Sequence, residues 1–170
     1  MHFIFYRATF SALAFIPLCC LGLEWNTYKG MEYVLVTTKM TWIEAQRYCS
    51  NFGGVLAQPE TADINNYLKS LTDKTTWLWI GASNLPDKKT WEWHNPIKPI
   101  KFSDWQSSEP SHPNSEHCMV YWKSNEGFKW GDLQCTSRKG FLCQRTKSSE
   151  KDSSCSDKKP VGQKCMTICL

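Results

Sequence analysis

The sequence predicts an α+β fold, because helical and strand patterns occupy different parts of the chain. Two segments in the first half carry apolar residues at helical spacing, and three short β-rich segments lie in the last third. Helices that are segregated from strands in this way favour α+β over an alternating α/β architecture. A length of 170 residues, of which 41% are hydrophobic, predicts one domain that can bury a core of its own.

The first predicted element is a strand over residues 32–37, a β-rich run bounded by polar residues. A helix should follow, because Thr41 and Glu44 fit a capping box in which each side chain satisfies a free backbone amide. Gly53 and Gly54 end this helix. Its apolar face carries Trp42, Ala45, Cys49 and Phe52.

A second helix is predicted by Ile64, Tyr67, Leu68 and Leu71, which have the spacing i, i+3, i+4, i+7. The short apolar run 77–82 predicts a buried strand. Three further strands, over residues 118–123, 127–130 and 140–145, close the domain.

Residues 94–117 form a long irregular stretch rich in Pro, Ser and Asn. Such a stretch within a compact domain is usually functional or disordered. Its apolar residues favour an ordered, functional loop anchored by Ile97, Ile100, Phe102 and Trp105.

Residues 1–22 are typical of a secretory signal peptide. A weakly basic start containing Arg7 precedes an apolar run over residues 8–18, and the small residue Gly22 suits cleavage before Leu23. The run is shorter than the roughly 20 apolar residues that a membrane-spanning helix needs. We therefore expect a secreted, extracellular protein without a membrane span. Cys19 and Cys20 leave with the signal peptide, and the remaining seven of the nine cysteines meet oxidising conditions.

The predicted domain covers residues 23–145, and a polar linker with a Cys-bearing basic tail follows over residues 146–170. Residues 145–170 carry a net charge of +3, whereas residues 23–144 are neutral. Because the basic charge lies outside the domain, we do not expect nucleic-acid binding. The tail holds Cys155, Cys165 and Cys169, an odd number, which predicts a disulfide-linked homodimer through one of them.

A series of motifs makes the chain resemble a C-type lectin-like domain over about residues 24–145, in the short form that lacks an N-terminal Cys pair. Their order and spacing together carry the resemblance. The motifs are Trp42-Ile43-Glu44-Ala45, Trp79-Ile80-Gly81-Ala82, Glu109-Pro110-Ser111, Glu116-His117-Cys118, Trp130-Gly131-Asp132 and Gly140-Phe141-Leu142-Cys143. The resemblance implies an α+β fold of two helices and short antiparallel sheets, with a long loop for calcium.

The same resemblance implies two disulfides, Cys49 with Cys143 and Cys118 with Cys135. Spacing alone does not select this pairing, since four cysteines allow three connectivities.

Three carboxylates lie in or near the long loop: Glu109, Glu116 and Asp132. Calcium takes about six to eight oxygen ligands, many of them carboxylates. Taken alone, the three residues are more simply interpreted as solvated surface acids. The resemblance implies instead that Glu109, Ser111, Glu116 and Asp132 bind both Ca²⁺ and carbohydrate, with Pro110 in the cis form.

Two positions depart from the mannose-type motif of the family. Residue 111 is Ser in place of Asn, and residue 131 is Gly in place of Asn. Ser111 keeps an oxygen but lacks the amide donor, and Gly131 offers no side chain at all. The mannose-type site is therefore expected to be degraded, with Asn114 or water as a substitute ligand. The family's auxiliary calcium site is expected to be absent, since its positions hold Asn84, Lys88, His112 and His117.

The predicted function is calcium-dependent carbohydrate binding by a secreted lectin with glycans or a glycoprotein as partner. The alternative is a calcium-independent domain that binds protein or matrix.

His112, His117 and Cys118 do not favour zinc, because Cys118 is committed to a disulfide. No nucleophile with a positioned base appears, so an enzyme is not expected. The alternating Trp77, Trp79, Trp91 and Trp93 form either a stacking surface or, as is usual in the resembling family, part of the core.

Overall fold

The computed structural model describes residues 23–147, which contain two helices and nine strands. In chain order they are β1 (Asn26–Tyr28), β2 (Met31–Met40), α1 (Trp42–Asn51), β3 (Val55–Leu56), α2 (Ala62–Ser70), β4 (Leu78–Ser83), β5 (Glu92–Trp93), β6 (Lys98–Pro99), β7 (Cys118–Ser124), β8 (Gly127–Leu133) and β9 (Lys139–Thr146).

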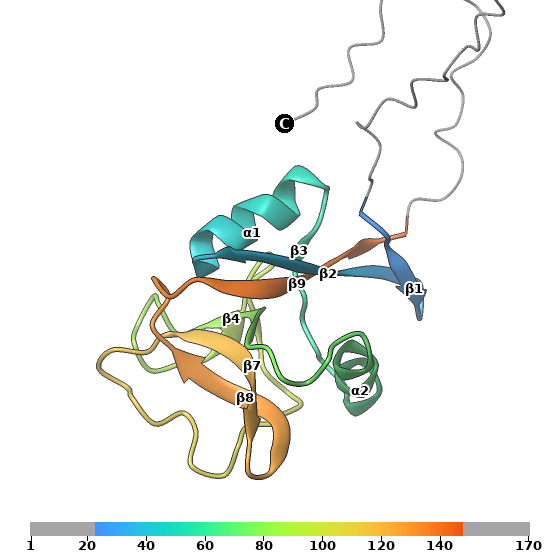
Figure 1. The fold of residues 1–170 in the computed structure, drawn as a ribbon. Coiled ribbons are helices and arrows are strands. Elements are labelled where there is room, and N and C mark those ends of the chain that lie inside the picture. The colour runs from blue at the N-terminus through green and yellow to red at the C-terminus, as the bar shows by residue number, and fades with distance from the viewer. Residues whose placement is uncertain (1–22, 148–170) are drawn as a thin grey trace, which may run out of the picture. The chain divides into compact units, whose positions relative to one another are not determined.

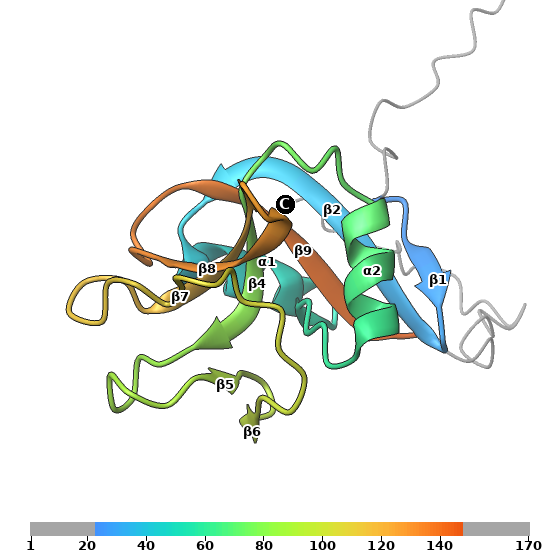
Figure 2. The same ribbon diagram turned by 90° about the horizontal axis from the view of Figure 1, so that it is seen from below.

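The centre of the fold is the antiparallel pair β2 and β9, which joins the start of the described chain to its end. The sheet continues from β9 to β4, β5 and β6, while β7 pairs with both β4 and β8. Figure 1 shows α1 on one side of the β2–β9 pair and β4, β7 and β8 on the other. In Figure 2, α2 lies beside β2 and close to β1.

The fold class is confirmed as α+β, with one refinement of the sheet. The β4 and β9 strands run parallel, with Leu78 opposite Gly140, so the sheet is mixed and not purely antiparallel as expected. Four short strands, β1, β3, β5 and β6, were not predicted. Each has two or three residues, too few to produce a recognisable alternation of apolar and polar residues.

Both predicted helices are present and both are capped at their N-termini. The capping box is complete, since Thr41 N donates to Glu44 Oε2 at 2.9 Å and Glu44 N donates to Thr41 Oγ1 at 3.3 Å. Thr61 caps α2 through its Oγ1 alone, which accepts a hydrogen bond from Ile64 N at 3.3 Å. Phe52 does not join the buried face as expected: it is the C-cap residue of α1 and is 40% exposed.

Three of the four predicted apolar anchors hold the long loop against the core, and the prediction for the fourth was wrong. Ile100, Phe102 and Trp105 pack against the core, whereas Ile97 is 66% exposed. Ile97 lies in the connection between β5 and β6, where the chain turns through the exposed Asn95 and Pro96.

The two disulfides pair as the resemblance implied. Cys49 to Cys143 ties α1 to β9 across 94 residues, and Cys118 to Cys135 closes the β7–β8 hairpin across 17 residues. All of these cysteines except Cys135 are fully buried.

Two of the four alternating tryptophans belong to the core, and Trp91 is packed against it. Trp79 and Trp93 are core residues, as expected. Trp77 and Trp91 are partly exposed: Trp91 packs edge-on against Trp105, and Trp77 packs on Trp122 with ring centroids 5.4 Å apart.

The predicted signal peptide and the three tail cysteines lie outside the described residues. Within residues 23–147, no helix has the length and apolar character needed to span a membrane.

Candidate functional site

The loop that carries the predicted site residues is held against β8 by backbone hydrogen bonds. Trp130 N donates to Asp104 O, and Gln106 N donates to Trp130 O, each at 3.0 Å. The Glu126 carboxylate at the tip of the β7–β8 hairpin accepts the Ser107 amide at 3.2 Å. These contacts bring the following Glu109-Pro110 segment, whose peptide bond is cis, next to residues 131 and 132 of β8.

Asp132 is the centre of the cluster. Its two carboxylate oxygens accept the backbone amides of Ser111 and His112, each at 3.1 Å. Its own amide donates to Glu109 Oε2 at 3.2 Å, and the Ser111 hydroxyl donates to Glu109 Oε1 at 3.0 Å. Three of the four predicted site residues are thus joined in one hydrogen-bonded group.

Glu116 and His112 complete the group from the far end of the loop. His112 Nδ1 lies 3.2 Å from Glu116 Oε2. Potential ligand atoms of His112, Glu116 and Asp132 all lie within 4.8 Å of one another. His112 was missed as a member of this cluster, because sequence reasoning placed it with His117 and Cys118 or at an auxiliary site.

The carboxyl groups are crowded, and their pKa values reflect this. Burial raises the pKa of Glu109, and the neighbouring Asp132 carboxylate raises it further. Burial also raises the pKa of Glu116, and the charge of Asp132 adds to the effect. Burial opposes the ionisation of Asp132, but hydrogen bonds from Glu109 and from the Ser111 and His112 amides outweigh it, so its pKa is lowered. The Asp132 carboxylate therefore makes ionisation of Glu109 and Glu116 less favourable.

Gly131 contributes no side chain to this cluster, and the space beside it is filled. A Cβ at residue 131 would lie 3.4 Å from Glu109 Oε2, but only 2.5 Å from Nε1 of Trp122. The indole of Trp122 therefore occupies the position from which a side chain at residue 131 would reach the carboxylates.

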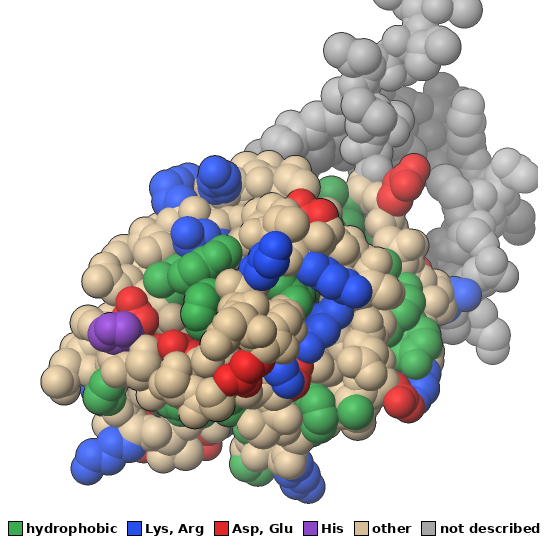
Figure 3. Space-filling view, turned by 60° about the horizontal axis from the view of Figure 1, so that its bottom comes forward, with side chains coloured by type: hydrophobic (Ala, Val, Ile, Leu, Met, Phe, Trp, Pro, Cys, Tyr) green, Lys and Arg blue, Asp and Glu red, His purple; other side chains and the backbone are tan. Residues whose placement is uncertain are grey.

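The donor set fits a hard divalent cation. Potential ligand atoms of His112, Glu116 and Asp132 lie close together, while Glu109 joins Asp132 from the other side through the Asp132 amide and the Ser111 hydroxyl. These are the ligand types that calcium prefers, although the set is smaller than a complete calcium cage. Figure 3 shows a histidine beside acidic side chains on the surface, with hydrophobic side chains adjoining them.

Other residues considered from the sequence do not join the cluster. His117 pairs with the buried Asn84, with Nδ1 and Oδ1 2.9 Å apart. Cys118 is bonded to Cys135, and Lys88 and Asn114 are exposed. His112, His117 and Cys118 therefore have different partners in the structure, and they do not form one group.

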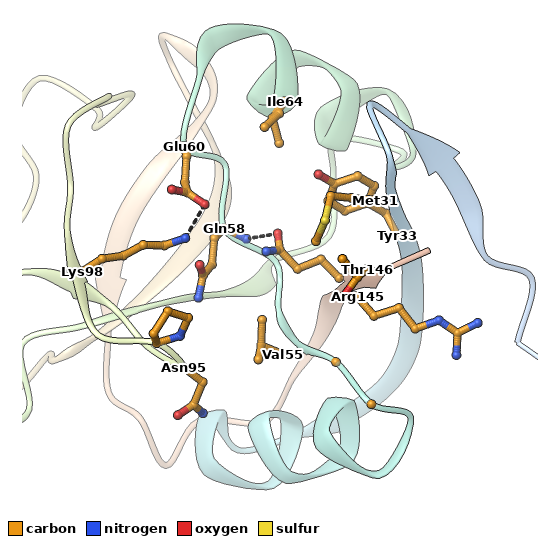
Figure 4. Close-up of a pocket in the computed structure, with 14 residues that line it drawn as sticks. Met31, Tyr33, Val55, Gln58, Glu60, Ile64, Asn95, Lys98, Arg145 and Thr146 are labelled. Carbon is orange, nitrogen blue, oxygen red and sulfur yellow. Dashed lines mark hydrogen bonds and ion pairs between the residues drawn. The ribbon is translucent and has the colours of Figure 1, made fainter. Parts of the chain in front are cut away.

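A separate cavity of about 370 Å³ is lined by residues of β2, β3 and β9 and of the β5–β6 connection, and it shares no lining residue with the cluster. Figure 4 shows Tyr33, Gln58 and Ile64 around it, with the Glu60–Lys98 ion pair at one side. Burial and the charge of Glu60 raise the pKa of Tyr33 to about 12, so its hydroxyl stays protonated.

The structure is thus an α+β domain braced by two disulfides, with an ordered loop that carries carboxylates. Comparisons with known proteins identify the family of such domains to which it belongs. The family model described as "Lectin C-type domain" matches residues 38–145, and the chain belongs to this family. This membership confirms the predicted recognition, and it confirms that the chain is not an enzyme.

Individual relatives are similar over most of the domain. C-type lectin BML-2 of Bungarus multicinctus is 30% identical over 129 residues, covering 72% of this chain and 81% of the relative. A "C-type lectin mannose-binding isoform" of Oxyuranus scutellatus is 25% identical over 133 residues, covering 74% and 84%. A solved calcium-independent type II antifreeze protein is 25% identical with a TM-score of 0.64, covering 72% of this chain and 91% of that structure.

Proposed function

We propose that this C-type lectin domain binds carbohydrate through a calcium ion held by Glu109, Glu116 and Asp132, with Ser111 as a weaker ligand. The observation that carries the proposal is the clustering of potential ligand atoms of Glu116 and Asp132, with His112 beside them, and the hydrogen bond that joins Glu109 to the Asp132 amide. Bound calcium would neutralise the crowded carboxyl groups and present open coordination positions to a pair of sugar hydroxyls.

The chain's own residues have distinct roles in this proposal. The backbone amides of Ser111 and His112 fix the orientation of the Asp132 carboxylate. Glu109 and Glu116, both only partly exposed, leave oxygens that accept hydrogen bonds from sugar hydroxyls as well as ligate the ion. The two missing amide side chains leave fewer donors for a sugar, so affinity for a single mannose should be weak. A hydrogen bond to a charged group contributes about 1.5–3 kcal/mol.

The names of similar proteins support this proposal. Relatives of the chain include lectins named as mannose-binding and as salivary, which supports carbohydrate as ligand and secretion as destination. We propose that residues 1–22 are a signal peptide, that residues 23–145 are the binding domain and that residues 146–170 form a tail.

A glycan array probed with and without calcium tests the proposed function. Calcium-dependent signal on mannose- or fucose-bearing glycans, abolished by a chelator and by Asp132→Ala, is the expected result. Signal that persists in chelator, or that survives Asp132→Ala unchanged, contradicts it.

The second candidate is a calcium-independent domain that binds a protein or a matrix. Gly131 and its neighbour Trp122 favour it, because together they remove a ligand position from the cluster. The likeness to a solved structure described as a calcium-independent type II antifreeze protein supports the calcium-independent part of this candidate. Absence of array signal in both buffers, with a folded protein, would favour this candidate.

A further inference from the structure

Trp122 has a position that the proposed function does not explain. It lies on β7 opposite Lys129 of β8, while Val120, two residues earlier, lies opposite Gly131. Since alternate residues of a strand share one face, Trp122 and Gly131 are diagonal neighbours on the same face of the hairpin.

The indole of Trp122 lies directly over Gly131. A Cβ at residue 131 would be 2.5 Å from its Nε1 and 2.8 Å from its Cδ1, so no residue other than glycine fits beside this ring unless the ring moves. The Trp122 ring also packs on Trp77, with the ring centroids 5.4 Å apart, and Nζ of Lys139 lies 4.8 Å from the centroid of the Trp77 ring. The Trp122 side chain is thus braced in place.

The indole N–H is buried and has no hydrogen-bond partner among the described residues. An indole N–H is a donor only, so it cannot ligate a cation. The space next to Gly131 and Glu109 Oε2 is therefore occupied by the Trp122 indole. This ring offers no oxygen, although the neighbouring cluster consists of oxygen ligands.

We propose that Trp122 is a specificity-determining residue of the carboxylate cluster, because its indole excludes any side-chain ligand at residue 131. This inference rests on the proposed function, since it concerns what the same cluster can bind. The cluster then holds its cation through carboxylates and the Ser111 hydroxyl, and it lacks an amide that could donate to a sugar hydroxyl. Trp122 thereby disfavours simple sugars that need such a donor. The partly exposed edge of the Trp122 ring lies beside the cluster where the amide side chain would otherwise be.

The steric part of the proposal can be tested without calcium. In chelator, Gly131→Ala should lower the melting temperature, and combining it with Trp122→Val should remove most of that loss. Trp91→Val is the matched control: it removes the same type of ring from a position where the ring packs on Trp105, so Gly131→Ala should lower the melting temperature as much in its presence as in the wild type. A Gly131→Ala variant as stable as the wild type would overturn the proposal.

The specificity part is tested by adding an oxygen ligand. Gly131→Asn alone should not raise calcium affinity in calorimetric titration, whereas Trp122→Val with Gly131→Asn should raise it about tenfold and strengthen mannose binding. A gain from Gly131→Asn alone, or a stable double variant without any gain, would overturn the proposal. Failure of the proposed function appears separately, as wild-type protein that binds neither calcium nor glycan in a calcium-dependent way.

Discussion

At the scale of single residues, Asn65 links the second helix to the functional loop. Its Oδ1 accepts the Tyr121 hydroxyl at 2.6 Å and the Trp130 indole N–H at 3.0 Å. Its Nδ2 donates to Asp104 Oδ2 at 2.7 Å. One buried amide therefore joins α2, β7, β8 and the start of the loop that leads to Glu109.

Replacing Asn65 with alanine should cost about 2–4 kcal/mol of unfolding free energy, because it leaves the buried Tyr121 hydroxyl and the buried Trp130 indole N–H without their acceptor. Chemical denaturation measures the change. The adjacent Asn66→Ala is the matched control, since Asn66 is exposed, and it should have little effect. Equal effects of the two substitutions would show that the network adds nothing to stability.

Asp104 makes stability depend on pH. Burial opposes its ionisation, but hydrogen bonds from Lys129, Lys69 and Asn65 outweigh burial and lower its pKa. A carboxylate with a lowered folded-state pKa stabilises the fold above its unfolded-state pKa, and that stabilisation is lost as pH falls through the lowered value.

We therefore expect Asp104→Asn to be less stable than the wild type near neutral pH, and to lose less further stability between about pH 5 and about pH 2. Denaturation curves at stepped pH values would show this difference in slope. Parallel pH profiles for the two proteins would contradict the role given to Asp104.

At the scale of elements, capping and periodicity were enough to predict both helices, since their signals are local in sequence. The short strands and the parallel β4–β9 pair were not predictable in this way. Leu56, for example, pairs with Cys143, and such a pairing depends on contacts that no local pattern records. Ile97 was misjudged for a related reason, because an apolar residue within a loop does not reveal whether the loop turns it inward.

The two disulfides should contribute unequally to the elements that they join. In the loop-entropy model, closing about 15 residues stabilises by about 3 kcal/mol and closing about 100 residues by about 4.7 kcal/mol. Replacing both Cys49 and Cys143 with alanine should thus destabilise more than replacing Cys118 and Cys135, as measured by denaturation. The reverse order would indicate that local packing, and not chain entropy, dominates.

At the scale of the whole molecule, the motifs of the sequence single out the carboxylates of the proposed site, whose ligand role stays a prediction, but they do not reveal which other groups surround them. Glu109, Glu116 and Asp132 come from the motifs of the resembling family. The entry of His112 into the cluster depends on how the loop folds back, with Glu116 N donating to His112 O at 2.9 Å. The filling of the Gly131 position depends on a side chain nine residues away on another strand, Trp122.

The tail cysteines Cys155, Cys165 and Cys169 lead to a prediction about assembly. Because their number is odd, one of them is expected to pair with a second copy of the chain. A dimer-sized band on a non-reducing gel, which collapses to a monomer on reduction, is the expected result. A monomer-sized band under both conditions would refute it.

The central claim is that Glu109, Glu116 and Asp132 hold a calcium ion, and calorimetric titration with calcium tests it most directly. The wild type should bind one ion, and Asp132→Asn should weaken binding about tenfold or more. Asp63→Asn, at a side chain that is 65% exposed and paired with Lys29, should bind as the wild type does. No binding heat in the folded wild type, or equal affinity in the wild type and Asp132→Asn, would contradict the claim.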